Sequence, residues 1–222
     1  MSIKLKHSGG NSVSLNPPTS APTSSEVAFK LPTSDGSAGQ VLTTDGSGNL
    51  SWITPAVNGV QVVDEWRTTN TQDINTTADL TAHWERNDNY FSQIGTGLTN
   101  LGSGVYQFGE TGIYLVTFTG SVYKTSGDNR FIGLRIYYSA DSGSNYNMMA
   151  ISYGSIKYIS GETFDQINAR AIIDVTNAST SRLKFNSTSS VIHTWTGGQE
   201  WAGTGNANTN TTGFNIIKLG DT

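Results

Sequence analysis

The sequence predicts an all-β protein, an antiparallel β-sandwich or jelly roll preceded by an extended N-terminal arm. Gly, Ser, Thr and Asn are abundant, charged residues make up only 14% of the chain, and helical periodicity is weak throughout. All five prolines fall within the first 55 residues. Because proline cannot donate to the hydrogen-bond ladder of a sheet, only the chain beyond them is free to form continuous strands. We therefore expect an arm over residues 1–56 and a head domain over residues 57–222.

Within the arm, short strand signals alternate with extended linkers. Residues 3–15 predict one short strand on each side of Gly9-Gly10, and EVAFKL (26–31) alternates apolar and polar residues as a strand does. The proline-rich segment 16–26 is expected to be extended and solvated. Segment 31–52 contains two Asp-Gly turns and these main large apolar residues: Val41, Leu42, Leu50 and Trp52.

Those four apolar residues are too few to fold the segment alone. Burying one such side chain contributes roughly 1.5–3 kcal/mol. Ordering ~20 residues costs about 1–2 kcal/mol for each residue. We therefore expect the segment to be ordered mainly by assembly, with three copies packing these side chains against one another, or by docking on a partner.

In the head, apolar and polar residues alternate along successive segments that polar turns separate. The longest apolar stretch, GIYLVTFTGSVY (112–123), carries bulky residues on both faces and is predicted to be a central strand. The other strands are predicted over residues 60–69, 104–108, 130–139, 147–154, 167–176, 182–188 and 212–220.

Two motifs in the head are more specific than its composition. Gly104, Tyr106 and Phe108 form a Gly-x-Tyr-x-Phe strand, which is followed by the turn Thr111-Gly112-Ile113-Tyr114. The chain also ends on a Gly-Phe-containing hydrophobic strand at 213–217. On these motifs, residues 57–222 resemble the globular-head family of complement, a relative of the tumour necrosis factor (TNF) jelly roll. The chain departs from that family in the long Gly-, Asn- and Trp-rich loop 190–211, and it lacks a collagen-like stalk.

This resemblance leads us to expect a homotrimer. Bulky residues on both faces of 112–123 and 213–219 agree with it, because one face can pack on the second sheet and the other on a neighbouring subunit. Core or trimer packing is predicted for Tyr106, Phe108, Tyr114, Phe118, Phe214 and Ile216.

The arm carries a second resemblance. KLPTSDGSAGQVLTTDGSGNLSW (30–52) is similar to a module in structural proteins of tailed bacteriophages, especially those of marine cyanobacteria, where it precedes or links fibre domains. KLKHSGGNSVSL (4–15) resembles the same set of proteins. Together, the two resemblances imply a virion protein that is assembled in the host cytoplasm.

No recognisable catalytic or metal-binding motif occurs in the chain. Cysteine is absent, and His7, His83 and His193 have none of the spacings of a metal site. The segments DGSGN (45–49) and DSGSN (141–145) lack the remaining positions of a calcium-binding EF-hand loop, and an initial Asp can cap such a turn without an ion. We therefore predict no enzyme activity, no catalytic residue, no cofactor and no metal ion. A calcium ion at these two turns stays open as the alternative, because some jelly-roll heads bind calcium.

The acidic residues are interpreted as structural or solvated. Asp64 and Glu65 are adjacent, so on a strand their side chains face opposite sides of the sheet. Glu85 and Asp88 lie in a polar stretch and are interpreted as solvated loop charges. The sequence leaves a glycosidase-type carboxylate pair open, because that chemistry depends on separation in space.

Trp195 and Trp201 differ from the other aromatic residues because Gly and polar residues surround them. Aromatic side chains in such a loop can stack on a sugar or anchor a partner protein. They can equally fold back and cover the end of the sandwich. Both interpretations stay open, and we predict Trp195 and Trp201 as contacts to a partner or receptor.

Taken together, these patterns predict a non-enzymatic, trimeric fibre or appendage of a bacteriophage virion. Residues 1–56 are expected to bind other virion proteins, and the head is expected to contribute to host adhesion by contacting a surface glycan or protein. The alternatives are a capsid decoration (cement) protein and, from another class, a soluble lectin-like carbohydrate-binding protein. With a net charge of −4, no basic block and no apolar run near ~20 residues, nucleic-acid binding and membrane insertion are not expected.

Overall fold

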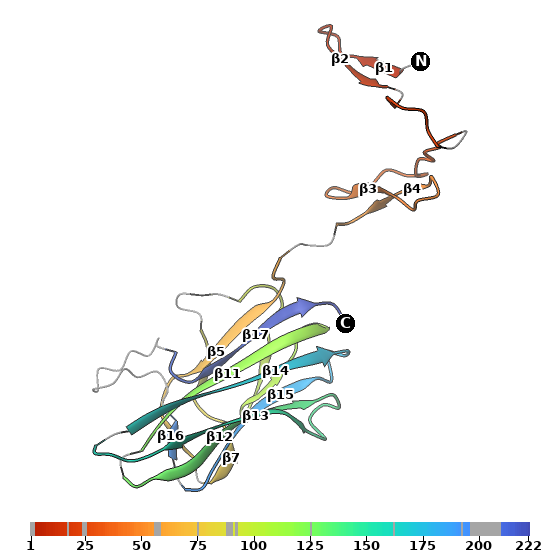
Figure 1. Ribbon diagram of the computed structural model, residues 1–222. Coiled ribbons are helices and arrows are strands. Elements are labelled where there is room, and N and C mark those ends of the chain that lie inside the picture. The colour runs from red at the N-terminus through yellow and green to blue at the C-terminus, as the bar shows by residue number, and fades with distance from the viewer. Residues whose placement is uncertain are drawn as a thin grey trace. The chain divides into compact units, whose positions relative to one another are not determined.

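The chain divides into two units, Met1–Asn58 and Gly59–Thr222. Every regular element in the described residues is a β-strand, and every pairing between strands is antiparallel (Figure 1). The all-β, antiparallel fold predicted from the sequence is therefore confirmed. The computed structural model describes residues 3–16, 18–23, 26–55, 59–74, 76–87, 91, 93–124, 126–161, 163–191, 193–195 and 210–222.

The first unit contains two short hairpins. Strands β1 (Ile3–Lys6) and β2 (Ser12–Leu15) pair around the Gly9-Gly10 turn, as expected. Strands β3 (Val41–Thr44) and β4 (Leu50–Ile53) form the second hairpin. The prediction of a strand over 26–31 is wrong, because only Lys30 pairs, in an isolated bridge with Asn49. Apolar and polar residues alternate over 26–31, but no partner strand pairs with the rest of this segment.

One layer of the second unit, which we call the β11 sheet, surrounds the predicted central strand β11. Strand β14 pairs with β11 along one edge, and β17 and β16 share its other edge. The position of 112–123 as a central strand is thus confirmed. The strands of this sheet are β5 (Val63–Thr68), β6 (Gln72–Ile74), β8 (Trp84–Arg86), β11 (Gly112–Lys124), β14 (Thr163–Val175), β16 (His193–Trp195) and β17 (Gly213–Gly220).

The second layer, which we call the β12 sheet, covers the inner face of the first (Figure 1). Strand β15 lies beside β12, and β10 and β7 pair with different parts of β15. The strands of this sheet are β7 (Thr77–Asp79), β9 (Thr99–Gly102), β10 (Val105–Gln107), β12 (Asn129–Ser139), β13 (Asn147–Ile156) and β15 (Arg182–Ser189).

An aromatic cluster fills the space between the two sheets. The ring centroids of Phe185 and Phe214 lie 4.2 Å apart, and Tyr106 meets Phe214 edge-on at 4.8 Å. Such pairs stabilise the core beyond the area that they bury. All six residues predicted to pack in the core or the trimer lie in this core, each with at most 2% of its surface exposed: Tyr106, Phe108, Tyr114, Phe118, Phe214 and Ile216.

Candidate interaction surfaces

The outer face of the β11 sheet carries a row of apolar side chains. Residues directly opposite in antiparallel strands share a face, and the register places Ile172, Leu115, Ile217 and Val63 opposite one another across four strands. Ile94 extends the row through a bridge to Val63. Ile172 is 63% exposed and Ile94 45%, and the other three are half-buried. We call these five residues the apolar row.

The next row on the same face is polar. Thr117 lies opposite Asn215 on one side and Arg170 on the other, and Asn215 lies opposite Glu65. Apolar side chains return at the other end of β11, where Tyr123 lies opposite Phe164. The bulky outer residues predicted for 112–123 therefore occur near its two ends, because Thr117, Thr119 and Ser121 occupy the middle of the outer face.

A buried carboxylate fixes the loop at the end of the apolar row. Asp64 is completely buried, and Arg86 donates to it from Nε at 2.8 Å and from Nη2 at 3.1 Å. The Trp66 indole nitrogen donates to Asp64 at 3.0 Å, and the backbone nitrogen of Leu98 donates at 2.7 Å. Gly97 is required here, because a Cβ atom at this position would lie 2.4 Å from an Asp64 oxygen. Four donors thus satisfy the buried charge.

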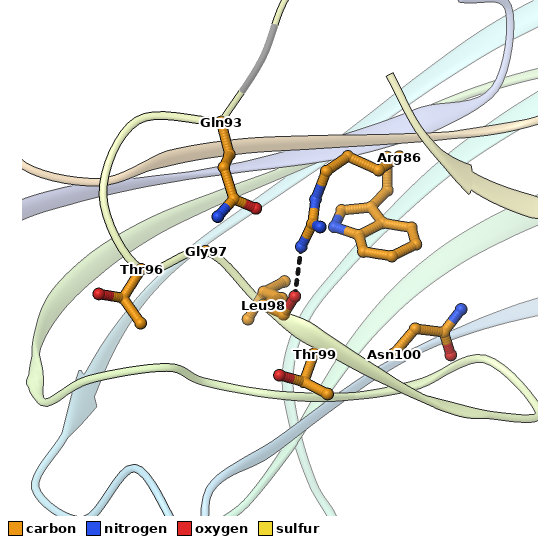
Figure 2. A pocket seen from close by; sticks show the side chains of 8 residues that line it. Arg86, Gln93, Thr96, Gly97, Leu98, Thr99 and Asn100 are labelled. Carbon is orange, nitrogen blue, oxygen red and sulfur yellow. Dashed lines mark hydrogen bonds between the residues drawn. The ribbon is translucent and has the colours of Figure 1, made fainter. Parts of the chain in front are cut away.

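A cavity of about 300 Å³ opens beside this carboxylate. Figure 2 shows Gln93 and Arg86 above the Gly97-Leu98 backbone, with the Arg86 guanidinium bonded to the Leu98 carbonyl. The Arg86 guanidinium also lies over the Trp66 ring, 4.7 Å from its centroid. The lining residues are Trp66, Arg86, Gln93, Thr96, Gly97, Leu98, Thr99 and Asn100.

In the arm, the β3–β4 hairpin leaves its apolar residues largely open within one chain. Trp52 donates its indole N–H to the Ser34 carbonyl at 3.0 Å, and Gly36 packs so closely on the Trp52 ring that a Cβ atom would lie 2.6 Å away. Trp52 nevertheless stays 38% exposed, Leu42 42% and Val41 46%, while Leu50 is half-buried. These side chains are therefore available to a neighbouring molecule.

Two turns with the pattern Asp-x-x-x-Asn have the same hydrogen bonding. Asp45 accepts bonds from the backbone and side chain of Asn49, and Asp141 accepts the equivalent bonds from Asn145. Bonds from Ser139 and Asn145 lower the pKa of Asp141 to about 2. The capping interpretation of both segments is confirmed, since the carboxylates close the turns by themselves. Within the described part of the chain, no group of three His, Asp or Glu side chains could hold a metal ion.

Three of the predicted contact and charge positions fall partly or wholly outside the described residues. The backbone of Trp195, in β16, pairs with Val122 of β11, but the Trp195 side chain lies outside the described residues. All of Trp201 and Asp88 lies outside them as well. The interpretation of Glu85 as a loop charge is wrong, because Glu85 lies in β8. Its carboxylate is 3.4 Å from the Arg67 guanidinium. Arg67 in β5 and Glu85 in β8 are 18 residues apart in the sequence, so no local sequence pattern predicts that they pair.

The contribution of Arg86 was not predicted from the sequence. Its partner Asp64 lies 22 residues earlier in the chain. The only signal was an Asp at an inward position of a predicted strand. A buried carboxylate needs a charged or hydrogen-bonding partner, but the sequence pattern does not show which residue supplies it.

No helix among the described residues is long and apolar enough to cross a membrane.

No family model matches this chain, and no curated protein matches it in sequence. Its structure is similar to that of Eiger TNF from S. frugiperda, with a TM-score of 0.55 and 11% identity over 74% of this chain and 96% of that chain. A weaker likeness, with a TM-score of 0.48, is to murine APRIL at 11% identity over 71% of this chain and 98% of that chain. The first likeness establishes a TNF-like jelly roll for the head and nothing about its activity.

Proposed function

We propose that this chain is a non-enzymatic structural protein of a bacteriophage virion, a trimeric fibre or appendage that residues 1–56 attach to other virion proteins. The head contributes to host adhesion, and the protein is assembled in the host cytoplasm. The TNF-like jelly roll, the phage-type module at 30–52 and the open apolar surfaces in both units support this proposal.

The apolar row is the observation that carries self-association. Its five side chains are adjacent on one face, and Ile172 is 63% exposed in the single chain. Contiguous apolar surface of this kind marks an interaction site more often than a scattered exposed residue does. An obligate trimer would cover the row with ~2,000 Å² or more of buried surface. In the arm, Val41, Leu42 and Trp52 offer a second apolar contact to neighbouring copies.

Sedimentation of the full chain at micromolar concentration tests the trimer. We expect the wild-type protein to sediment as a trimer and Leu115→Arg to sediment as a folded monomer, because the substitution places a charge within the apolar row, between Ile172 and Ile217. Tyr153→Arg is the matched control, since Tyr153 is 59% exposed in β13 of the other sheet. A wild-type monomer with a folded β spectrum, or a Leu115→Arg trimer, would contradict the proposal.

An electron-microscopy map of the intact particle tests the place of the protein in the virion. Density for the head at the tip or along a tail appendage supports the proposed fibre role. Density spread over the capsid shell would instead identify a decoration protein, with the arm lying across the shell. Absence of the chain from purified particles would contradict both roles.

A further inference from the structure

The cavity beside Arg86 is lined by hydrogen-bonding groups that the fold itself does not use. It is formed by strands β5, β8 and β9 and by the loop before β9, all from one chain (Figure 2). Its volume of about 300 Å³ is at the lower limit of small-ligand pockets, which run from ~300 to ~1,000 Å³. This is room for one or two small rings and not for an extended chain.

The hydrogen bonds of Arg86 decide which ligands the cavity can take. Its Nε–H donates to Asp64, and the two hydrogens of Nη2 are directed to Asp64 and to the Leu98 carbonyl. Only the two N–H groups of Nη1 make no hydrogen bond within the described part of the chain. The positive charge is already compensated by Asp64, and a bidentate grip on a carboxylate needs two nitrogens. The remaining donors therefore suit neutral oxygen atoms.

The other polar groups around the cavity are neutral and combine donors with acceptors. The Thr96 and Thr99 hydroxyls make no intramolecular hydrogen bond in the part of the chain that the structure describes. Gln93 uses only its amide nitrogen, toward the Gly95 carbonyl, which leaves its carbonyl oxygen open. Asn100 uses only its carbonyl oxygen, toward the Gly102 nitrogen, which leaves its amide N–H groups open. A ligand with hydroxyl groups, each able to donate and accept, matches this set.

We propose that this cavity binds a neutral sugar residue of a glycan. The ligand hydroxyls accept from Arg86 Nη1 and Asn100, donate to Gln93, and exchange bonds with the two threonine hydroxyls. The Asp64 bonds hold the guanidinium in place before the ligand arrives, so little conformational freedom is lost on binding. The inference rests on the host-adhesion part of the proposed function and gives that adhesion a ligand class and a site.

Saturation-transfer difference NMR on the full-length protein tests the proposal with single sugars as probes. Glucose, galactose, mannose and N-acetylglucosamine represent neutral ligands, and glucuronate and N-acetylneuraminate represent anionic ones. We expect saturation transfer to at least one neutral sugar, with a dissociation constant in the millimolar range, and weaker transfer to the anionic probes.

Variants of exposed residues assign the signal to the cavity. Thr99→Trp fills the cavity, and Leu101→Trp makes the same change at a 50%-exposed position of β9 that does not line it. We expect Thr99→Trp to raise the dissociation constant about tenfold or more and Leu101→Trp to leave it within about twofold. Gln93→Ala removes one acceptor without filling the space, and we expect a severalfold weakening that does not depend on how Thr99→Trp folds.

Three results would overturn the sugar site: no transfer to any neutral sugar, a stronger signal from the anionic probes, or a signal that Thr99→Trp and Gln93→Ala leave unchanged. Failure of this inference and failure of the proposed virion role are distinguishable. Sedimentation and the particle map report assembly without any sugar present, and the NMR experiment reports the cavity without any particle.

Discussion

Replacing Asp64 with Asn should destabilise the head strongly although it changes only one atom of the side chain. The carboxylate is completely buried and accepts four hydrogen bonds, two of them from the Arg86 guanidinium. An Asn amide offers one oxygen in place of two, and its NH₂ group would face donors. If the amide NH₂ group replaces Oδ1, it faces the Arg86 Nε–H, and if it replaces Oδ2, it faces Arg86 Nη2, the Trp66 indole N–H and the Leu98 N–H. In either orientation the charged guanidinium loses a hydrogen-bond acceptor.

The size of the effect follows from the burial of Asp64. Removing one partner of a fully buried ion pair typically costs ~3–5 kcal/mol, because the remaining charge is left uncompensated. Since Arg86 is 32% exposed, we expect a loss at the lower end of this range, about 3 kcal/mol. Each kcal/mol lowers Tm by ~2–4 °C in a domain of this size, so we expect Tm to fall by roughly 6–12 °C. A domain whose whole stability is ~5–15 kcal/mol would remain folded at room temperature in most of this range.

Urea denaturation followed by tryptophan fluorescence measures this loss. The matched control is Asp79→Asn, because Asp79 pairs with Lys184 at 2.9 Å where both side chains are partly exposed, at 37% and 22%. Such a pair contributes less than about 1 kcal/mol. If Asp64→Asn cost no more than Asp79→Asn, the buried carboxylate would not be what holds the loop.

Three further predictions test the same structure. The Tyr106 hydroxyl is buried without a hydrogen-bond partner in the described residues, so Tyr106→Phe should leave Tm unchanged or raise it. Tyr114→Phe is the contrasting variant and should cost ~0.5–1.5 kcal/mol of unfolding free energy, because the Tyr114 hydroxyl donates to the Glu110 carbonyl. The lowered pKa of Asp141 means that its stabilisation is complete above the ordinary value of 3.8 and is lost as pH falls toward about 2. The stability difference between the wild type and Asp141→Asn, from urea titrations, should therefore shrink over that interval, and a constant difference would refute the assignment. Deleting residues 1–55 should leave a folded, soluble head by circular dichroism, and an unfolded product would show that the arm supplies part of the core of the head.

Long strands were predictable from the sequence because alternation repeats many times within them. The 13-residue strand β11 and the 11-residue strand β12 give an unambiguous pattern. Strands β6, β7 and β8 have only three residues each, which is too short for a period to be visible, so the sequence did not predict them. The reverse failure occurred at 26–31, where the alternation is present but no strand ladder pairs with it.

The candidate site was only half predictable for a related reason. Alternation alone places the side chains of Asp64 and Glu65 on opposite faces, and the structure confirms this, with Asp64 buried and Glu65 partly exposed. The identity of the partner depends on the pairing of β5 with β8 and on the path of the loop that brings Leu98 to the carboxylate. Neither is a local property of the chain, so residue spacing could not reveal Arg86 as the partner of the buried Asp64.

The alternation along β5 also explains how one strand serves two surfaces. Val63 points outward into the apolar row, and its backbone exchanges hydrogen bonds with Ile94 at 2.9 and 3.1 Å. Asp64, the next residue, points inward and holds Leu98, four residues beyond Ile94. The loop between these two anchors is the wall of the cavity, so Asp64 sets both the end of the apolar row and the shape of the proposed sugar site.

The three key substitutions should therefore separate the two surfaces. Leu115→Arg changes the apolar row on β11, which lies two strands from β5, the first strand that lines the cavity, and Thr99→Trp changes the cavity without touching the row. Asp64→Asn should release the loop between Ile94 and Leu98, which contributes to both the apolar row and the cavity. Because all the lining groups come from one chain, the proposed sugar binding would not require the proposed trimer. The proposed association and adhesion would then be independent of each other, joined only through the buried carboxylate of β5.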